Sequence, residues 1–166
     1  MDIAIRPVGE ISGLSETPFT PGDTVWSYLF RSGEGFIERL DVLEGEREAL
    51  ELEGAVICRW SQLIKDKGVT EAEERRAALQ SADDIFLSLF EEVPEGEEDS
   101  TTTGTRERLK FFLALQLERK RILKPLGGRR YRHMPTKREL AVPDMAITPE
   151  LIADFQNEIS LMGRPR

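Results

Sequence analysis

The stretch from Arg106 to about Lys124 places the strongest constraint on how this chain can fold. Its apolar side chains recur at helical spacing, and neighbouring ones widen the stripe: Leu109, Phe111, Phe112, Leu113, Ala114, Leu115 and Leu117. A helix with so broad an apolar surface needs cover on most of its sides. We therefore expect a central core helix over 105–124, which begins at Thr105 as its cap and ends before Pro125.

The first part of the chain predicts a small sheet. A Pro21-Gly22-Asp23 turn leads into residues 24–30, which are rich in aromatic and β-branched side chains. Residues 32–35 predict a hairpin loop before a second run over 36–42, and residues 54–60 predict a third strand. We expect this β-rich part to span 18–61, with about three antiparallel strands whose apolar face needs helices as cover.

Further helices are predicted before and after the central helix in the sequence. In the 70–92 region, Thr70 opens a helix to about Gln80 and Ser81 opens a second one. A C-terminal helix is expected over 148–163, with Pro149 at its first position. Residues 93–104 predict an acidic flexible loop, because residues 94–104 include no apolar side chain able to offset the cost of ordering. Residues 125–147 predict a basic extended segment.

Together these elements predict one domain, 1–166, of the α+β class. Its small antiparallel sheet packs against the central helix and the C-terminal helix.

Charge is segregated along the chain. From Arg106 to Leu140 there are twelve Lys/Arg and three Glu, a balance of 12 − 3 = +9, although the whole chain has a net charge of −8. From Glu38 to Ser100 there are nineteen acidic and seven basic residues, a balance of 7 − 19 = −12. This polarity either pairs the two halves with each other or presents a basic surface to an anionic partner.

The basic segment supplies the candidate binding site. Cations around an aromatic side chain and a Gly127-Gly128 pair suit phosphate contacts, with stacking on Tyr131. The candidate residues for anion or partner binding are Arg119, Lys120, Arg121, Lys124, Arg129, Arg130, Tyr131 and Arg132. Three interpretations stay open: solvated or internally paired cations that also complement a helix end, a nucleic-acid site, or a site for an acidic protein.

No residue pattern predicts catalysis. His133 has no Ser or Cys nucleophile in a recognisable motif, so we expect it to lie in a surface loop. Asp83 and Asp84 are interpreted as capping residues at a helix start. Arg39 and Asp41 lie two apart on one strand and are expected to form an ion pair, either exposed or buried.

Several classes of protein are excluded or disfavoured. Cys58 is the only cysteine and His133 the only histidine, which excludes an intrachain disulfide and a zinc site of Cys and His ligands. Cys58 lies in an apolar run and is expected to be a buried, inert thiol. No glycine motif has the spacing of a nucleotide cradle, so no cofactor or metal is expected.

The first residues resemble no signal peptide, and no run reaches the ~18 apolar residues of a membrane span. We therefore expect a cytoplasmic protein without a membrane partner.

A set of short motifs resembles an uncharacterised bacterial family with no established activity. The motifs are Phe19-x-Pro21-Gly22-Asp23, Ser27-x-Leu29, Arg39-x-Asp41, Trp60 and the leucine-rich run from Leu113 to Leu123 that contains Arg119-Lys120-Arg121. Members of this family often carry cysteines just before the Pro-Gly turn, which implies a small metal site. Here Ser12 and Ser15 occupy that region, so the resemblance implies a common fold and a cytoplasmic setting but no metal.

The sequence thus leaves two functions open. The first is a non-enzymatic interaction or scaffold protein whose partner is another protein. The alternative is an accessory protein that binds RNA or DNA through the basic segment 119–138. The sequence does not predict an oligomeric state.

Overall fold

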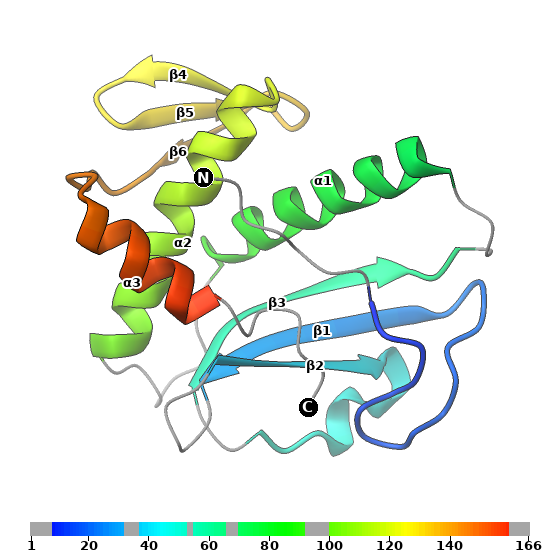
Figure 1. The fold of residues 1–166 in the computed structure, drawn as a ribbon. Helices are drawn as coiled ribbons and strands as arrows, with labels where there is room; N and C mark the ends of the chain where they lie inside the picture. The colour runs from blue at the N-terminus through cyan, green and yellow to red at the C-terminus, as the bar shows by residue number, and fades with distance from the viewer. Residues whose placement is uncertain (1–7, 32–36, 53–54, 66–69, 92–99, 160–166) are drawn as a thin grey trace.

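The computed structural model describes residues 8–31, 37–52, 55–65, 70–91 and 100–159 (Figure 1). The elements are, in chain order, β1 (Thr24–Arg31), β2 (Ile37–Leu43), the 3-10 helix η1 (Glu44–Ala49), β3 (Ala55–Leu63), α1 (Glu71–Ser88), α2 (Ser100–Arg119), β4 (Leu123–Gly127), β5 (Arg130–His133), β6 (Arg138–Ala141) and α3 (Pro149–Ile159). The predicted α+β class is confirmed, with two small antiparallel sheets rather than one. No helix among the described residues is long and apolar enough to cross a membrane.

The first sheet has the strand order β2-β1-β3 and follows the three predicted strands. Gly22, with a φ of 94°, makes the turn that brings the chain into β1, a conformation that glycine adopts without strain. The register places Ser27 opposite Asp41 on one side and Trp60 on the other, so these side chains share the face toward the helices. The predicted hairpin loop over 32–35 lies outside the described residues.

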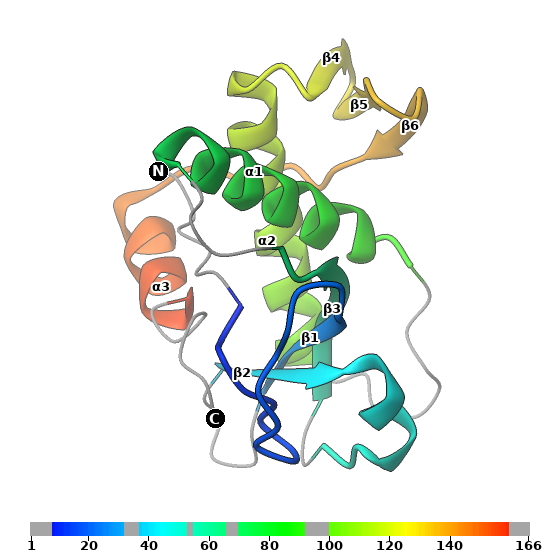
Figure 2. The same cartoon turned by 90° about the vertical axis from the view of Figure 1, so that its right-hand side faces the viewer.

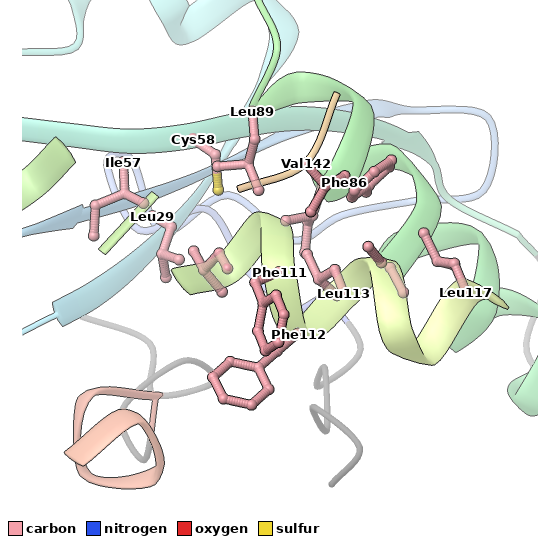
Figure 3. Packing of buried hydrophobic residues seen from close by; sticks show 14 of the residues in the cluster. Leu29, Ile57, Cys58, Phe86, Leu89, Phe111, Phe112, Leu113, Leu117 and Val142 are labelled. Carbon is pink, nitrogen blue, oxygen red and sulfur yellow. The ribbon is translucent and has the colours of Figure 1, made fainter. Parts of the chain in front are cut away.

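Helix α2 runs from the first sheet to the second, and α1 crosses beside it (Figures 1 and 2). One apolar core fills the space between these layers. Figure 3 shows contributions from all of them: Leu29, Ile57 and Cys58 of the first sheet, Phe86 of α1 with Leu89 at its end, Phe111, Phe112, Leu113 and Leu117 of α2, and Val142 after β6. The predicted central position of the leucine-rich helix is therefore confirmed.

The segment predicted as basic and extended, 125–147, instead contains most of a second sheet with the order β4-β5-β6. Its strands have only four or five residues, and cations alternate with inward-facing side chains in β5 alone, so the pattern of a half-buried sheet is weak in the sequence. Leu123 of β4 and Leu140 of β6 belong to the core, so one face of this sheet packs inward. The other face is turned to solvent.

Both long helices differ in extent from the prediction. The break expected at Ser81 lies inside one continuous α1, because Ala82 and Phe86 are packed in the core there. Residues 100–104 of the predicted flexible loop belong to α2, and the rest of that loop lies outside the described residues. Helix α2 ends at Arg119 rather than at Lys124.

The C-terminal helix α3 packs on the core through Phe155, with Leu151 and Ile152 partly buried beside it. Phe155 is fully buried, and its ring stacks on that of Phe112 in α2 at a centroid distance of 4.5 Å. Replacing Phe155 with alanine removes this contact and leaves a cavity, so Phe155→Ala should lower the free energy of unfolding by about 3–5 kcal/mol. Urea unfolding followed by circular dichroism measures this change. The exposed neighbour Gln156→Ala is the control, and equal losses in the two variants would contradict the packing described here.

Candidate functional site

Cations gather on the outer face of the β4-β5-β6 sheet. Lys124 pairs in register with Arg132, and Arg132 pairs with Glu139 on the other side. Partners in an antiparallel sheet point to the same face, so these three side chains form a row across the strands. Arg130 lies two residues from Arg132 on β5 and therefore shares that face. Glu139 is the one carboxylate among the strand residues of this face that the structure describes.

The turns around this sheet add three further cations. Arg121 precedes β4, Arg129 lies in the loop between β4 and β5, and Lys137 lies in the loop between β5 and β6. All three are exposed. We call these three and the three outer-face strand residues the cationic surface: Arg121, Lys124, Arg129, Arg130, Arg132 and Lys137.

The structure brings together most, but not all, of the eight predicted site residues. Five belong to the cationic surface, whereas Arg119 and Lys120 lie at the end of α2. Tyr131 points to the inner face and hydrogen-bonds Glu118 of α2. Partial burial, the Glu118 charge and this hydrogen bond raise the pKa of the Tyr131 hydroxyl. Tyr131 therefore fastens the sheet to α2 and cannot serve as a stacking platform on the outer face.

Few carboxylates neutralise the cationic surface. Arg129 lies 3.5 Å from Asp144, and Arg132 lies 3.7 Å from Glu139, in pairs that are both largely exposed and therefore weak. In the described part of the chain, Arg121, Lys124, Arg130 and Lys137 have no carboxylate within ion-pair distance. Residues 119–141 hold nine Lys/Arg and one Glu, a balance of 9 − 1 = +8 in a chain of net charge −8.

The three turn cations occupy left-handed backbone positions. Four non-glycine residues among those described have positive φ, and three of them are Arg121 (62°), Arg129 (66°) and Lys137 (61°). Side chains other than glycine reach this region at a cost of about 1–2 kcal/mol each. The fourth, Glu16 (62°), lies in the N-terminal loop, away from this sheet.

Two of these turns are of types that favour glycine. At the end of α2, the Arg121 N–H donates to the Glu118 carbonyl at 3.0 Å and the Ile122 N–H donates to the Leu117 carbonyl at 3.0 Å. This is the Schellman pattern, in which the position of Arg121 is most often glycine. The loop of Gly128 and Arg129 has positive φ at both residues, as a type I′ hairpin requires, a turn that strongly favours glycine at its second position.

His133 forms a second feature, and here the prediction of a surface-loop histidine is wrong. Its ring is 1% exposed, and its Nε2 lies 2.7 Å from Oδ1 of Asp83 in α1. The interpretation of Asp83 as a helix cap is wrong for the same reason, because it lies buried in the interior of α1. A buried imidazole needs partners for both ring nitrogens, and Asp83 supplies one of them across fifty residues of sequence.

The other ring nitrogen of His133 faces its own turn. Nδ1 lies 2.7 Å from the Thr136 hydroxyl and 3.3 Å from the Thr136 backbone nitrogen. A backbone N–H can only donate, so Nδ1 accepts and the ring proton lies on Nε2, where Asp83 accepts it. Both nitrogens are thus occupied and the ring is buried. This arrangement positions the β5–β6 turn against α1 and leaves no free base for catalysis.

Arg39 and Asp41 form the predicted ion pair, and the pair is buried. Arg39 Nε donates to Asp41 Oδ1 at 3.0 Å, and the Ser27 hydroxyl donates to the same oxygen at 2.6 Å. The Gly9 N–H donates to the other carboxylate oxygen at 3.1 Å, so this network fastens the N-terminal loop to the first sheet. Its role is structural. In the described part of the chain, no three His, Cys, Asp or Glu side chains cluster closely enough to hold a metal ion.

Cys58 is buried, as predicted, and burial raises the pKa of its thiol to about 12 against the attraction of Arg106 and Arg39 and a hydrogen bond with Ser88. A thiolate is therefore strongly disfavoured in the folded chain.

A comparison of Asp83→Ala with Asp84→Ala tests the buried pair. Both substitutions replace an aspartate of α1 with alanine, but only Asp83→Ala leaves the His133 Nε2–H without its acceptor. Asp83→Ala should therefore lower the free energy of unfolding by about 1–3 kcal/mol more than Asp84→Ala does. Urea unfolding at neutral pH measures the difference. Losses of the same size would show that the His133–Asp83 bond contributes nothing to stability.

The raised pKa of Cys58 predicts a loss of stability at alkaline pH. Above about pH 9 the thiol ionises in the unfolded chain but stays protonated in the folded one, so unfolding becomes easier as the pH rises toward 12. Between about pH 8 and 10.5 the wild type should lose about 2 kcal/mol relative to Cys58→Ala. The measurement is urea unfolding of both proteins at each pH, because the difference between them removes the contribution of the other titrating groups. Free energies of unfolding that change with pH in parallel for the two proteins would contradict the prediction.

Comparisons with family models, curated proteins and solved structures find no match to this chain. The resemblance to a bacterial family through the Pro-Gly-Asp turn and the leucine-rich helix therefore stays a prediction. The features that bear on function are the cationic surface and the buried His133–Asp83 pair.

Proposed function

We propose that this chain is a non-enzymatic binding protein whose cationic surface docks an acidic segment of another protein. A cytoplasmic setting is part of the same proposal. The observation that carries it is the presence of Arg121, Arg129 and Lys137 at left-handed positions.

The positions of these three cations cost the isolated chain free energy. Glycine at these three positions would relieve about 1 kcal/mol of backbone strain at each, partly offset by the greater freedom that glycine gives the unfolded chain. Lys124 directly opposite Arg132 adds a like-charge pair, which is unfavourable in a sheet. Apart from the exposed Arg129–Asp144 pair, the described structure gives no reason to place these cations here. A partner with negative charge does, because it turns each of them into a favourable contact.

Several features favour an acidic protein over a nucleic acid. The outer face of the described sheet carries no aromatic side chain, and Tyr131 is turned inward, so bases have no surface on which to stack. Carboxylates already fit between the cations, as Glu139 and Asp144 do.

Exchanging the three strained cations for glycine tests the proposal. The combined variant Arg121→Gly, Arg129→Gly and Lys137→Gly should be at least as stable as the wild type, because the backbone strain is removed. Its affinity for a fluorescein-labelled oligoglutamate peptide should fall about tenfold, since three ionic contacts of about 0.5 kcal/mol each are lost. Fluorescence anisotropy measures the affinity and urea unfolding the stability.

Two control variants distinguish an effect at the cationic surface from a general loss of positive charge and from the relief of backbone strain. The first control removes three exposed cations elsewhere on the chain and should leave binding nearly unchanged. It combines Lys65→Gln, Arg75→Gln and Arg76→Gln. Glu16→Gly relieves the same kind of backbone position away from the surface and should raise stability without weakening binding. If the glycine variant binds the peptide as tightly as the wild type, the cationic surface is not the site. Salt-sensitive binding to duplex RNA or DNA, with none to the peptide, would favour the nucleic-acid alternative.

A further inference from the structure

We infer that the free edge of β3 is a docking surface for a second copy of this chain, which adds its own β3 to form one continuous antiparallel sheet. Residues 59–63 of β3 carry this surface, and a two-fold axis at Ser61 relates the two copies. The inference goes beyond the proposed function and does not rest on the cationic surface.

The backbone of β3 has a row of unpaired hydrogen-bonding groups along this edge. The Ile64 N–H donates to the Asp23 carbonyl at 2.8 Å, so the backbone groups of Ile64 point to the side of β1. Successive residues of an antiparallel strand point these groups to opposite sides, so those of Leu63, Ser61 and Arg59 point away from β1. Among the described residues, none of these three N–H and three C=O groups has a hydrogen-bond partner. They are a template for one more strand.

Helix α1 leaves this part of the edge uncovered. At the beginning of β3, Ile57 is 1% exposed, because it packs in the core to which α1 and α2 contribute. Further along the strand, Ser61 is exposed and the apolar side chain of Leu63 is 59% exposed. Residues 71–78 of α1 are all exposed as well, because the helix diverges from β3 toward its N-terminal end (Figures 1 and 2). A strand can therefore reach the edge at 59–63.

The opposite edge of the same sheet is protected, in contrast to that of β3. There the N-terminal loop runs along β2, and the Gly13 N–H donates to the Asp41 carbonyl at 2.9 Å. The loop fits so closely that a side chain on Gly13 would collide with Leu40. Native sheets commonly protect an edge with a covering loop, a proline, charges or a bulge. Residues 59–63 have no proline and a single charge, Arg59, so this stretch is able to pair.

A second copy fits this edge because residues 59–63 are self-complementary about Ser61. An antiparallel strand centred there places Ser61 opposite the partner subunit's Ser61, and Arg59 opposite the partner subunit's Leu63. The unpaired N–H and C=O groups of each copy then meet those of the other. Leu63 packs on the aliphatic stem of the arginine, which removes an exposed apolar side chain from water.

Other two-fold centres pair the edge less well. A centre at Gln62 places Arg59 opposite the partner subunit's Lys65, and like charges directly opposite each other are unfavourable. A centre at Trp60 needs the edge at Ile57, which the core encloses. The register centred at Ser61 is therefore the one that uses the whole accessible stretch.

Charge does not oppose this contact, although the whole chain has a net charge of −8. Residues 59–65 carry two cations, and residues 71–78 carry two arginines and three glutamates, a balance of 4 − 3 = +1. Each copy thus brings both signs to the contact, so the carboxylates of one copy can face the cations of the other.

Sedimentation velocity of the whole chain, from about 10 µM to about 0.5 mM, tests the inference. A pairing of five residues from each copy buries little surface, so the dimer should be weak, with a dissociation constant on the order of 100 µM.

The position of Ser61 on the two-fold axis gives a sharper test. Ser61→Lys and Ser61→Glu each place like charges opposite each other and should weaken the dimer about fivefold. An equimolar mixture of the two variants should dimerise at least as tightly as the wild type, because lysine then faces glutamate. Gln156→Lys and Gln156→Glu make the same changes at an exposed residue of α3 and should leave dimerisation unchanged, alone or mixed.

Circular dichroism checks that each variant folds, and cross-linking tests the register should Ser61→Lys not fold. Cys58, the natural thiol, is buried, so an introduced cysteine is the reactive one. A short bismaleimide should link Ser61→Cys chains to each other. It should link Leu63→Cys chains much less, because those two residues lie about 13 Å apart along the paired strands.

The outcomes distinguish this dimer from the proposed function. A chain that stays monomeric at about 0.5 mM overturns the inference, and so does a mixture of the two Ser61 variants that dimerises no better than either alone. A dimer that the glycine substitutions at Arg121, Arg129 and Lys137 abolish, but Ser61→Lys does not, also overturns it. Ser61→Lys should bind the oligoglutamate peptide as the wild type does. A wild type that dimerises but does not bind the peptide overturns the proposed function alone.

Discussion

The structure depends on the burial of α2 on nearly all of its sides. Its buried residues, Leu109, Phe112, Leu113, Ala114 and Leu117 among them, point in directions that no single sheet could cover. The first sheet, α1, α3 and the inner face of the second sheet each take part of this surface (Figure 2). The basic segment therefore packs against the core with one face and exposes the other.

The parts of the fold that follow from the sequence are those with strong local patterns. The Pro21-Gly22 turn, the aromatic first strand and the leucine-rich helix predict the first sheet and the central helix correctly. The second sheet escapes prediction because its strands have only four or five residues and carry cations at outward positions. Its signal is weak: Arg130 and Arg132 alternate with Tyr131 and His133, which face the core.

The candidate site shows why contiguous residues need not share a surface. Alternation along β5 separates Tyr131 from the arginines beside it, so the combination that suggested phosphate contacts with stacking is divided between two faces. Local sequence patterns cannot predict the His133–Asp83 hydrogen bond, because its two residues lie fifty positions apart. A lone polar residue predicts burial only once a partner in space is known.

The position of Arg121 shows why helix-end electrostatics cannot account for the cationic surface. Cations near the end of a helix complement its partial negative charge, but Arg119 and Lys120 already do so from unstrained positions. Arg121 lies one residue further on, where the Schellman turn favours glycine, and Arg129 and Lys137 occupy left-handed positions in the turns of the second sheet. Natural sequences tend to make local choices that agree with the fold. Three local disagreements of one kind around one small sheet are the observation that supports the proposed acidic partner, because a negatively charged ligand would offset their cost.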